Sequence, residues 1–240
     1  MSDMDLELKL LAGMPINIEG VGKIFSPTVR EIIEIGESNY NQYLSALLFD
    51  KNSIETDIKE ELSNFEMMFA YAYHHEEFRK ILFESISFFF KDEVHLDHDD
   101  QDVFFLFKNG KMGKSVFENV QDIIKTANWV SDSSEESEQY NPADEETAKV
   151  IREMLERRKK KAKPKPVVNL YSIISAIAWK SPDMNISKIL DLTIFQLYDG
   201  FRRLEKIDSI HYTLNGIYSG NVDAKKINMS DLNWAKIIET

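Results

Sequence analysis

The order of secondary structure near the start of the chain is set by residues 16–49, which read INIEGVGKIFSPTVREIIEIGESNYNQYLSALLF. Short apolar stretches around the first two glycines predict a small β-hairpin over residues 16–25. Ser26 and Pro27 then predict the start of a helix, because a serine side chain caps free N–H groups and proline is well tolerated in the first turn.

The helix that begins there should reach about Phe49, since its apolar side chains mostly follow helical spacing. Gly36 lies inside this span and marks a kink or a close contact. Residues 54–90 predict one or two further helices with a wide apolar face. This part of the chain is therefore expected to be mostly helical.

A second β segment follows these helices. Residues 103–107, VFFLF, predict a strand that enters a tight turn at the Asn-Gly pair 109–110, because this pair tolerates the positive φ angles of a type I′ turn. Val94–Asp97 should form the neighbouring strand. Residues 115–128 then predict an amphipathic helix with a capping box begun by Ser115.

The C-terminal third is strongly helical in pattern. Residues 169–180, NLYSIISAIAWK, predict a helix capped by Asn169 and ended by Pro182. Residues 186–206 predict a helix pair, or one helix bent near Asp191–Thr193.

A final helix is expected over residues 230–239, with Trp234 as its anchor. The fold class predicted is mainly α with small β hairpins. Three parts are expected: an α+β domain over residues 1–130, a charged linker over residues 131–166, and a helical domain over residues 167–240.

The linker is predicted from its charge. The chain has 29 Lys and Arg against 41 Asp and Glu, for a net charge of −12. Residues 131–148 hold 7 acidic and no basic side chains, whereas residues 149–166 hold 9 basic and 2 acidic ones. Such an acidic block followed by a basic block, between two more apolar regions, is typical of a boundary.

Several classes of protein are excluded by the composition. No apolar run approaches the roughly 18 residues that span a bilayer, so we expect no membrane contact. The first ten residues, MSDMDLELKL, lack the pattern of a secretory signal. The absence of cysteine removes disulfides and cysteine-ligated zinc. A soluble intracellular protein is the expectation.

The densest group of potential metal ligands is residues 95–102, HLDHDDQD. On a strand, His95 and Asp97 would share one face, and His98 and Asp100 the other. Histidine with carboxylate suits divalent first-row metals. The alternative is a solvated acidic turn between two strands, and we favour it, so we expect no metal and no cofactor.

No enzyme motif is found. The glycines near residues 20 and 110 lack the Lys-Ser/Thr pair of a P-loop and the full dinucleotide fingerprint. No Gly-x-Ser-x-Gly elbow is present. We therefore expect a protein that is not an enzyme and has no catalytic residues.

Nucleic-acid binding is the alternative function. Its candidate residues form one basic cluster, Arg157, Arg158, Lys159, Lys160 and Lys161, which could contact phosphates. Residues 169–206 also resemble a helix-turn-helix in their succession of helices and breaks.

The last helix of that arrangement argues against DNA binding. Only Gln196, Arg202 and Arg203 could contact bases or phosphates, and nearby acidic side chains would repel the duplex. Residues 167–240 have no net charge, whereas nucleic-acid-binding domains are usually basic. We therefore expect a packing helix, and no nucleic acid as partner.

A family resemblance adds a functional expectation. Residues 8–50, with Pro-Thr-x-Arg-Glu-Ile followed by Ile-Gly-x-x-x-Tyr-Asn-x-Tyr-Leu, resemble proteins from the tail-morphogenesis regions of tailed bacteriophages and prophages of Gram-positive bacteria. Residues 186–206 and the Asp-Leu-Asn-Trp at 231–234 are similar to the C-terminal region of the same proteins.

The resemblance implies a non-enzymatic role in the virion or in tail assembly, in the host cytoplasm or within the finished particle. Such proteins include tail assembly chaperones, which hold the tape-measure protein before polymerisation. The partners implied are phage tail or tape-measure proteins, and a homo-oligomer is an open alternative.

The partner-binding surface is expected on apolar helical faces that could dock against a partner helix. Two sets of residues are the candidates. They are Tyr40, Tyr43, Leu44 and Leu47 in the first long helix, and Phe195, Tyr198 and Phe201 in the C-terminal helix pair.

Overall fold

The computed structural model describes residues 3–51, 62–99, 102–130 and 168–238. The helices are α1 (Asp3–Leu11), α2 (Val29–Ile35), α3 (Glu37–Leu47), α4 (Asn64–His74), α5 (Glu76–Phe90), α6 (Lys114–Ala127), α8 (Leu170–Lys180), α9 (Ile186–Leu190) and α10 (Ile194–Tyr218), with 3-10 turns η2 (Ala224–Lys226) and η3 (Met229–Leu232). The strands are β1 (Ile16–Ile18), β2 (Gly22–Ile24), β3 (His95–His98), β4 (Val103–Phe107) and β5 (Gly110–Met112). The predicted fold class, mainly α with small β hairpins, is confirmed.

Both predicted β segments are present. Strands β1 and β2 pair antiparallel, with Ile16 opposite Ile24. Strands β3, β4 and β5 form an antiparallel sheet in that order. In β4, Phe105 and Phe107 are buried while Leu106 faces out, which gives the sheet one core face.

The type of the β4–β5 turn was predicted wrongly. Phe107 pairs with Gly110, so Lys108 and Asn109 form the loop, and neither has a positive φ. Glycine is required at position 110 for a different reason. The N–H of Lys111 donates to the carbonyl of Gly20 at 3.1 Å, and a Cβ on Gly110 would lie 1.8 Å from that same oxygen. The two hairpins thus touch through their backbones.

The start of the first long helix is also corrected. Thr28, not Ser26, is the N-cap of α2, and it forms a capping box with Glu31. The hydroxyl of Ser26 is buried and has no hydrogen-bond partner among the residues that the structure describes. Gly36, at φ 87°, divides the predicted helix into α2 and α3 as its backbone freedom suggested.

Three other helix ends were predicted with mixed success. The N-cap of α6 is Gly113, which has no side chain to cap the helix. Ser115 lies inside the first turn and is not the cap. Asn169 does cap α8, and the break before Ile194 separates α9 from α10. The expected final helix is wrong: residues 229–232 form one 3-10 turn, and Trp234 lies beyond it, 60% exposed.

One hydrophobic cluster forms the core of the described residues. Aromatic rings at its centre come from distant parts of the chain: Phe65 of α4 lies 5.7 Å from Phe105 of β4 and 5.4 Å from Phe117 of α6, between ring centroids. Ile177 of α8 and Leu197 of α10 belong to the same cluster. The division into two domains stays a prediction, and its linker lies outside the described residues.

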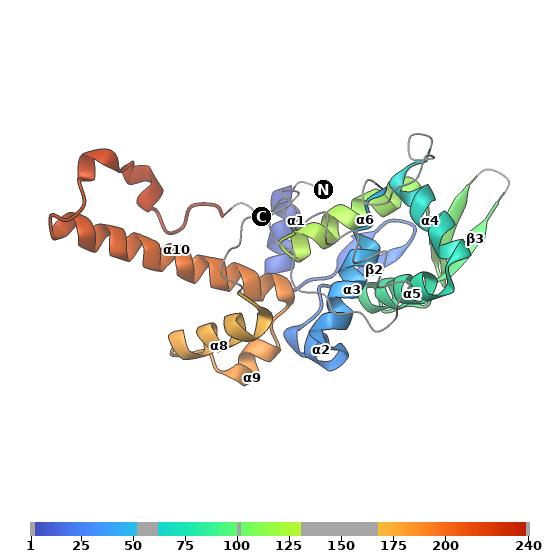
Figure 1. Cartoon of the computed structure of the whole chain (residues 1–240), viewed down its shortest axis with the longest axis horizontal. Coiled ribbons are helices and arrows are strands. Elements are labelled where there is room, and N and C mark those ends of the chain that lie inside the picture. The colour runs from blue at the N-terminus through green and yellow to red at the C-terminus, as the bar shows by residue number, and fades with distance from the viewer. Residues whose placement is uncertain (1–2, 52–61, 100–101, 131–167, 239–240) are drawn as a thin grey trace.

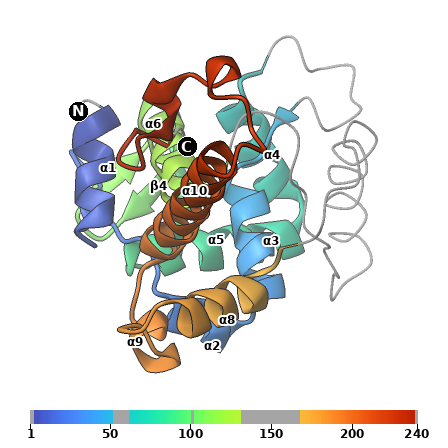
Figure 2. The same cartoon turned by 90° about the vertical axis from the view of Figure 1, so that its left-hand side faces the viewer.

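Helix α10 extends far beyond this core. Figure 1 shows it projecting away from the other helices, with the terminal segment folding back along it. Its 25 residues correspond to about 37 Å. In the end-on view of Figure 2, α8 and α6 lie on different sides of its base. Among the described helices, none has the length and apolar character to cross a bilayer.

The contact between the hairpins yields a test. Gly110→Ala forces a methyl group onto the Gly20 carbonyl, so we expect the free energy of unfolding in urea to fall by about 1–3 kcal/mol. Gly200→Ala is the control, because a Cβ there meets no atom within 4 Å and alanine favours a helix interior by about 0.5–1 kcal/mol. Two variants with equal stability would contradict the close contact.

Candidate protein interface

The base of α10 is joined to the start of α2 through the backbone. Thr28 and Thr193 form an isolated antiparallel bridge. The N–H of Val29 donates to the carbonyl of Leu192, and the N–H of Ile194 donates to the carbonyl of Pro27, both at 2.9 Å. Each helix thereby satisfies one of its free first-turn N–H groups with a carbonyl that precedes the other helix.

Side chains complete this junction. Thr193 and Gln196 form a capping box, and the Gln196 Nε2 also donates to the carbonyl of Leu11 in α1 at 2.8 Å. Beside the first turn of α10, the Trp129 ring lies 5.7 Å from the Phe195 ring and 5.0 Å from the guanidinium carbon of Arg202. These contacts tie α10 to α1 and to the end of α6.

Glu31 is the charged member of the junction. Burial raises the pKa of its carboxyl, but hydrogen bonds from Lys91 and Thr28 and the positive charge of Lys91 outweigh burial. The pKa therefore lies below its ordinary value of 4.5. Lys91 Nζ is 2.7 Å from Glu31 Oε1, so the ionised carboxylate links α2 to the end of α5.

Helix α8 packs beside α10 and presents aromatic side chains to solvent. Leu170, Ile173 and Ile177 are buried on its inner side, and Lys180 forms an ion pair with Asp208 of α10. On the outer side, Tyr171 is 77% and Trp179 87% exposed. We call Tyr171 and Trp179 the α8 outer face.

The far end of α10 carries a second exposed apolar surface. Tyr212 is 74% and Tyr218 82% exposed, and Asn215 between them is exposed as well. Residues 209–222, SIHYTLNGIYSGNV, contain no Asp, Glu, Lys or Arg, although 29% of the chain is charged. We call Tyr212, Asn215 and Tyr218 the α10 tip.

The terminal segment covers another part of the α10 surface. Arg203 Nη1 donates to the carbonyls of Trp234 at 2.7 Å and Lys236 at 2.9 Å. At the far end, the N–H groups of Asn221 and Val222 both donate to the carbonyl of Gly216. The segment is therefore held at both of its ends, and the three residues of the α10 tip stay exposed.

The predicted partner surface is contradicted at three of its seven residues. Tyr40, Leu47 and Phe195 are buried in the hydrophobic cluster. The Tyr40 hydroxyl donates to Asn128 Oδ1, and burial, with the nearby Tyr198 adding to it, raises the pKa of Tyr40 well above its usual range. Side chains so enclosed cannot contact a partner, because their helical spacing places them toward the protein's own core.

The remaining members of that surface are half-buried. Leu44, Tyr198 and Phe201 pack against the cluster. The Tyr43 hydroxyl donates to Glu84 Oε2 at 3.2 Å, and burial together with Glu84 raises the pKa of Tyr43 to about 12.

The exposed aromatic residues of α8 and α10 were missed by the sequence analysis. Two signals in the sequence could have found them. One is the charge-free run at residues 209–222. The other is the position of Trp179, which lies on the side of α8 opposite to Ile173 and Ile177.

The residues proposed for nucleic-acid contact fall into two sets. Arg157, Arg158, Lys159, Lys160 and Lys161 lie outside the described residues. The three polar side chains of the helix-turn-helix hypothesis are engaged within the protein: Gln196 with Leu11, Arg202 with Trp129, and Arg203 with the terminal segment. This use of the side chains argues against groove recognition by α10.

The acidic stretch after β3 behaves as a turn in the part that the structure describes. Asp99 Oδ1 accepts a hydrogen bond from the N–H of Asp102, and Lys111 Nζ lies 3.4 Å from Asp99 Oδ2. Asp100 lies outside the described residues. Within the described ranges, no three His, Asp or Glu side chains converge as metal ligands.

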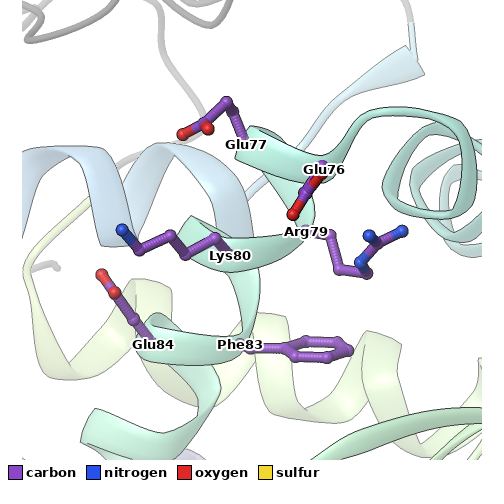
Figure 3. A pocket seen from close by; sticks show the side chains of 6 residues that line it. All are labelled: Glu76, Glu77, Arg79, Lys80, Phe83 and Glu84. Atoms are coloured by element: carbon purple, nitrogen blue, oxygen red, sulfur yellow. The ribbon is translucent and has the colours of Figure 1, made fainter.

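A depression lies along the surface of α5. All of its lining residues come from that one helix: Glu76, Glu77, Arg79, Lys80, Phe83 and Glu84. Figure 3 shows Lys80 extending to the same side as Glu77 and Glu84, whereas Arg79 and Phe83 extend to the other. Alternating charges at this spacing are typical of a solvated helix face.

Comparison with known families gives one match. Residues 159–239, about a third of the chain, match the family described as the YomV second domain, a phage- and prophage-associated family. The described part of this match contains α8, α9, α10 and the terminal segment. No curated protein matches the chain, and no solved structure does either.

The junction at α2 predicts a pH dependence. Because the pKa of Glu31 is lowered in the folded chain, its carboxylate stabilises the fold above about pH 4.5 and loses this effect as the pH falls through the folded pKa. We expect Glu31→Gln to cost about 0.3–1 kcal/mol of unfolding free energy at neutral pH, and less as the pH falls, in urea titrations.

Glu34→Gln is the matched control, because Glu34 is exposed on the same helix. A cost of Glu31→Gln that is independent of pH, or equal to that of Glu34→Gln, would contradict the assignment.

Proposed function

We propose that this chain is a non-enzymatic phage protein that takes part in tail assembly through protein–protein contacts. Its partner is a helical tail component such as the tape-measure protein, which the chain would hold in the host cytoplasm before polymerisation. The observation that carries the proposal is the α8 outer face, an exposed aromatic surface within the region that matches a phage-associated family.

The chemistry of α8 supports a protein partner. Aromatic side chains, tryptophan above all, are enriched at the centres of protein interfaces, where charged residues are depleted. Residues 170–179, LYSIISAIAW, carry no charged side chain. The inner side of the helix packs on the protein's own core through other residues. Tyr171 and Trp179 are therefore not needed for that packing.

The spacing on α8 favours a helix as the partner. Tyr171, Ser175 and Trp179 follow each other at four-residue intervals, and residues so spaced lie along one side of a helix. Such a stripe fits the apolar face of another helix, with the aromatic rings as anchors. A long helical tail protein presents many faces of this kind that would otherwise aggregate.

The proposal is tested by co-purification. The tape-measure protein encoded by the same phage is co-expressed with the tagged chain, and we expect the two to elute together. Tyr171→Glu combined with Trp179→Glu places two charges on the α8 outer face and should reduce the co-purified partner at least tenfold. Both residues are exposed, so thermal unfolding should be unchanged.

Tyr73→Glu is the matched control, because Tyr73 is 65% exposed on α4, outside the C-terminal region. It should bind as the wild type does. Full binding by the Tyr171→Glu, Trp179→Glu variant would contradict the assigned surface. No binding of any tail component by the wild-type chain would contradict the proposed function.

A further inference from the structure

The α10 tip is a second apolar surface, separate from the α8 outer face that the proposed function uses. We propose that its partner is a second copy of this chain, and that two α10 helices pair antiparallel at their tips. The body of each copy is the set of helices and strands around the base of α10. The dimer would place the two bodies at opposite ends of the paired helices.

The shape of the partner follows from what covers α10 closer to its base. There, α8 lies against α10 and is tied to Asp208 by Lys180. Tyr212 is one turn beyond Asp208 on the same side of α10, since residues four apart are neighbours on a helix. Past the end of α8, Tyr212, Asn215 and Tyr218 stay exposed, so a second helix can extend the packing that α8 begins.

The tip forms a continuous face. At 3.6 residues per turn, Tyr212, Asn215 and Tyr218 fall within about a third of the helix circumference. Arg203, on the other side of α10, binds the end of the terminal segment, and Val222 packs against Gly216 at the edge of the face. Tyr212, Asn215 and Tyr218 stay exposed, with Asn215 at the centre of the face and a tyrosine toward each edge.

Charge favours a second copy as the occupant. The chain has a net charge of −12, so contacts between two bodies would be repulsive. Residues 209–222 have no charged side chain and lie at the far end of the projecting helix (Figure 1). Tip-to-tip pairing separates the bodies by more than the Debye length of about 8 Å, so their repulsion is screened.

The size of the tip sets the strength of the dimer. Two tyrosines at 74% and 82% exposure offer roughly 300 Å² per copy, and a standard interface buries about 800 Å² per partner. Even with the neighbouring polar side chains, the interface belongs to the small class. The dimer is therefore weak and reversible, and its population rises with protein concentration.

Sedimentation velocity of the purified chain over a range of concentrations tests this pairing. We expect the weight-average mass to rise from 27.9 kDa toward twice that value. Tyr212→Glu combined with Tyr218→Glu should hold the mass at that of the monomer, because two copies would then meet with like charges. Tyr73→Glu should behave as the wild type.

Cross-linking locates the contact. The chain has no cysteine, so Asn215→Cys introduces a single thiol at the tip and Tyr73→Cys a single thiol on the body. Under mild oxidation, Asn215→Cys should form disulfide-linked dimers at least tenfold faster. A monomer at all concentrations, equal rates for the two thiols, or an oligomer unaffected by the tip charges would overturn the proposal.

These measurements use the chain alone, without a tail protein, and leave the α8 outer face intact. Their failure is therefore distinguishable from failure of the proposed function, which is tested with a partner and with variants of α8.

Discussion

The structure depends on a backbone bridge between two helix starts that lie far apart in the sequence. Helices α2 and α10 each begin with N–H groups that have no partner within the helix. The two helix starts meet at Thr28 and Thr193. The first N–H of each helix donates to a carbonyl that lies just before the start of the other helix. Capping boxes at both threonines each satisfy one more N–H group, that of Glu31 in α2 and that of Gln196 in α10.

This bridge determines what the C-terminal region can do. The base of α10 contributes Ile194, Phe195 and Leu197 to the core, and α8 packs beside it. Among the described residues, the terminal segment, held by Arg203, packs on the far half of α10, where Tyr212 and Tyr218 stay exposed. The exposed tyrosines of the far half are thereby accessible to other molecules, on a helix whose base is fixed in the core.

Local signals in the sequence predicted much of the fold. The hairpin at residues 16–25, the Asn169 cap and the break before α10 each depend on turn or capping chemistry within a few residues. The cap of α2 was misplaced because Ser26 and Thr28 are both suitable by type. The local signal that separates them is Glu31, three residues after Thr28, because it completes a capping box that Ser26 lacks.

The interface was harder to predict, for a physical reason. An apolar stripe such as that of Tyr40 and Leu47 looks the same whether it faces the protein's own core or a partner. Exposure distinguishes the two, and exposure depends on tertiary packing. In α10 apolar side chains occur on several sides, so periodicity did not separate buried Ile210 from exposed Tyr212. The lack of charge over residues 209–222 was the usable signal.

The central claim is that the bridge at Thr28 and Thr193 makes α10 part of the body. Native-state hydrogen exchange at the amides of Val29 and Ile194 tests it most directly, because these two amides donate across the bridge. We predict that both exchange only with the global opening free energy shown by core amides such as that of Leu82 in α5. Exchange of Ile194 through a local opening of much lower free energy, with Leu82 still protected, would contradict the account.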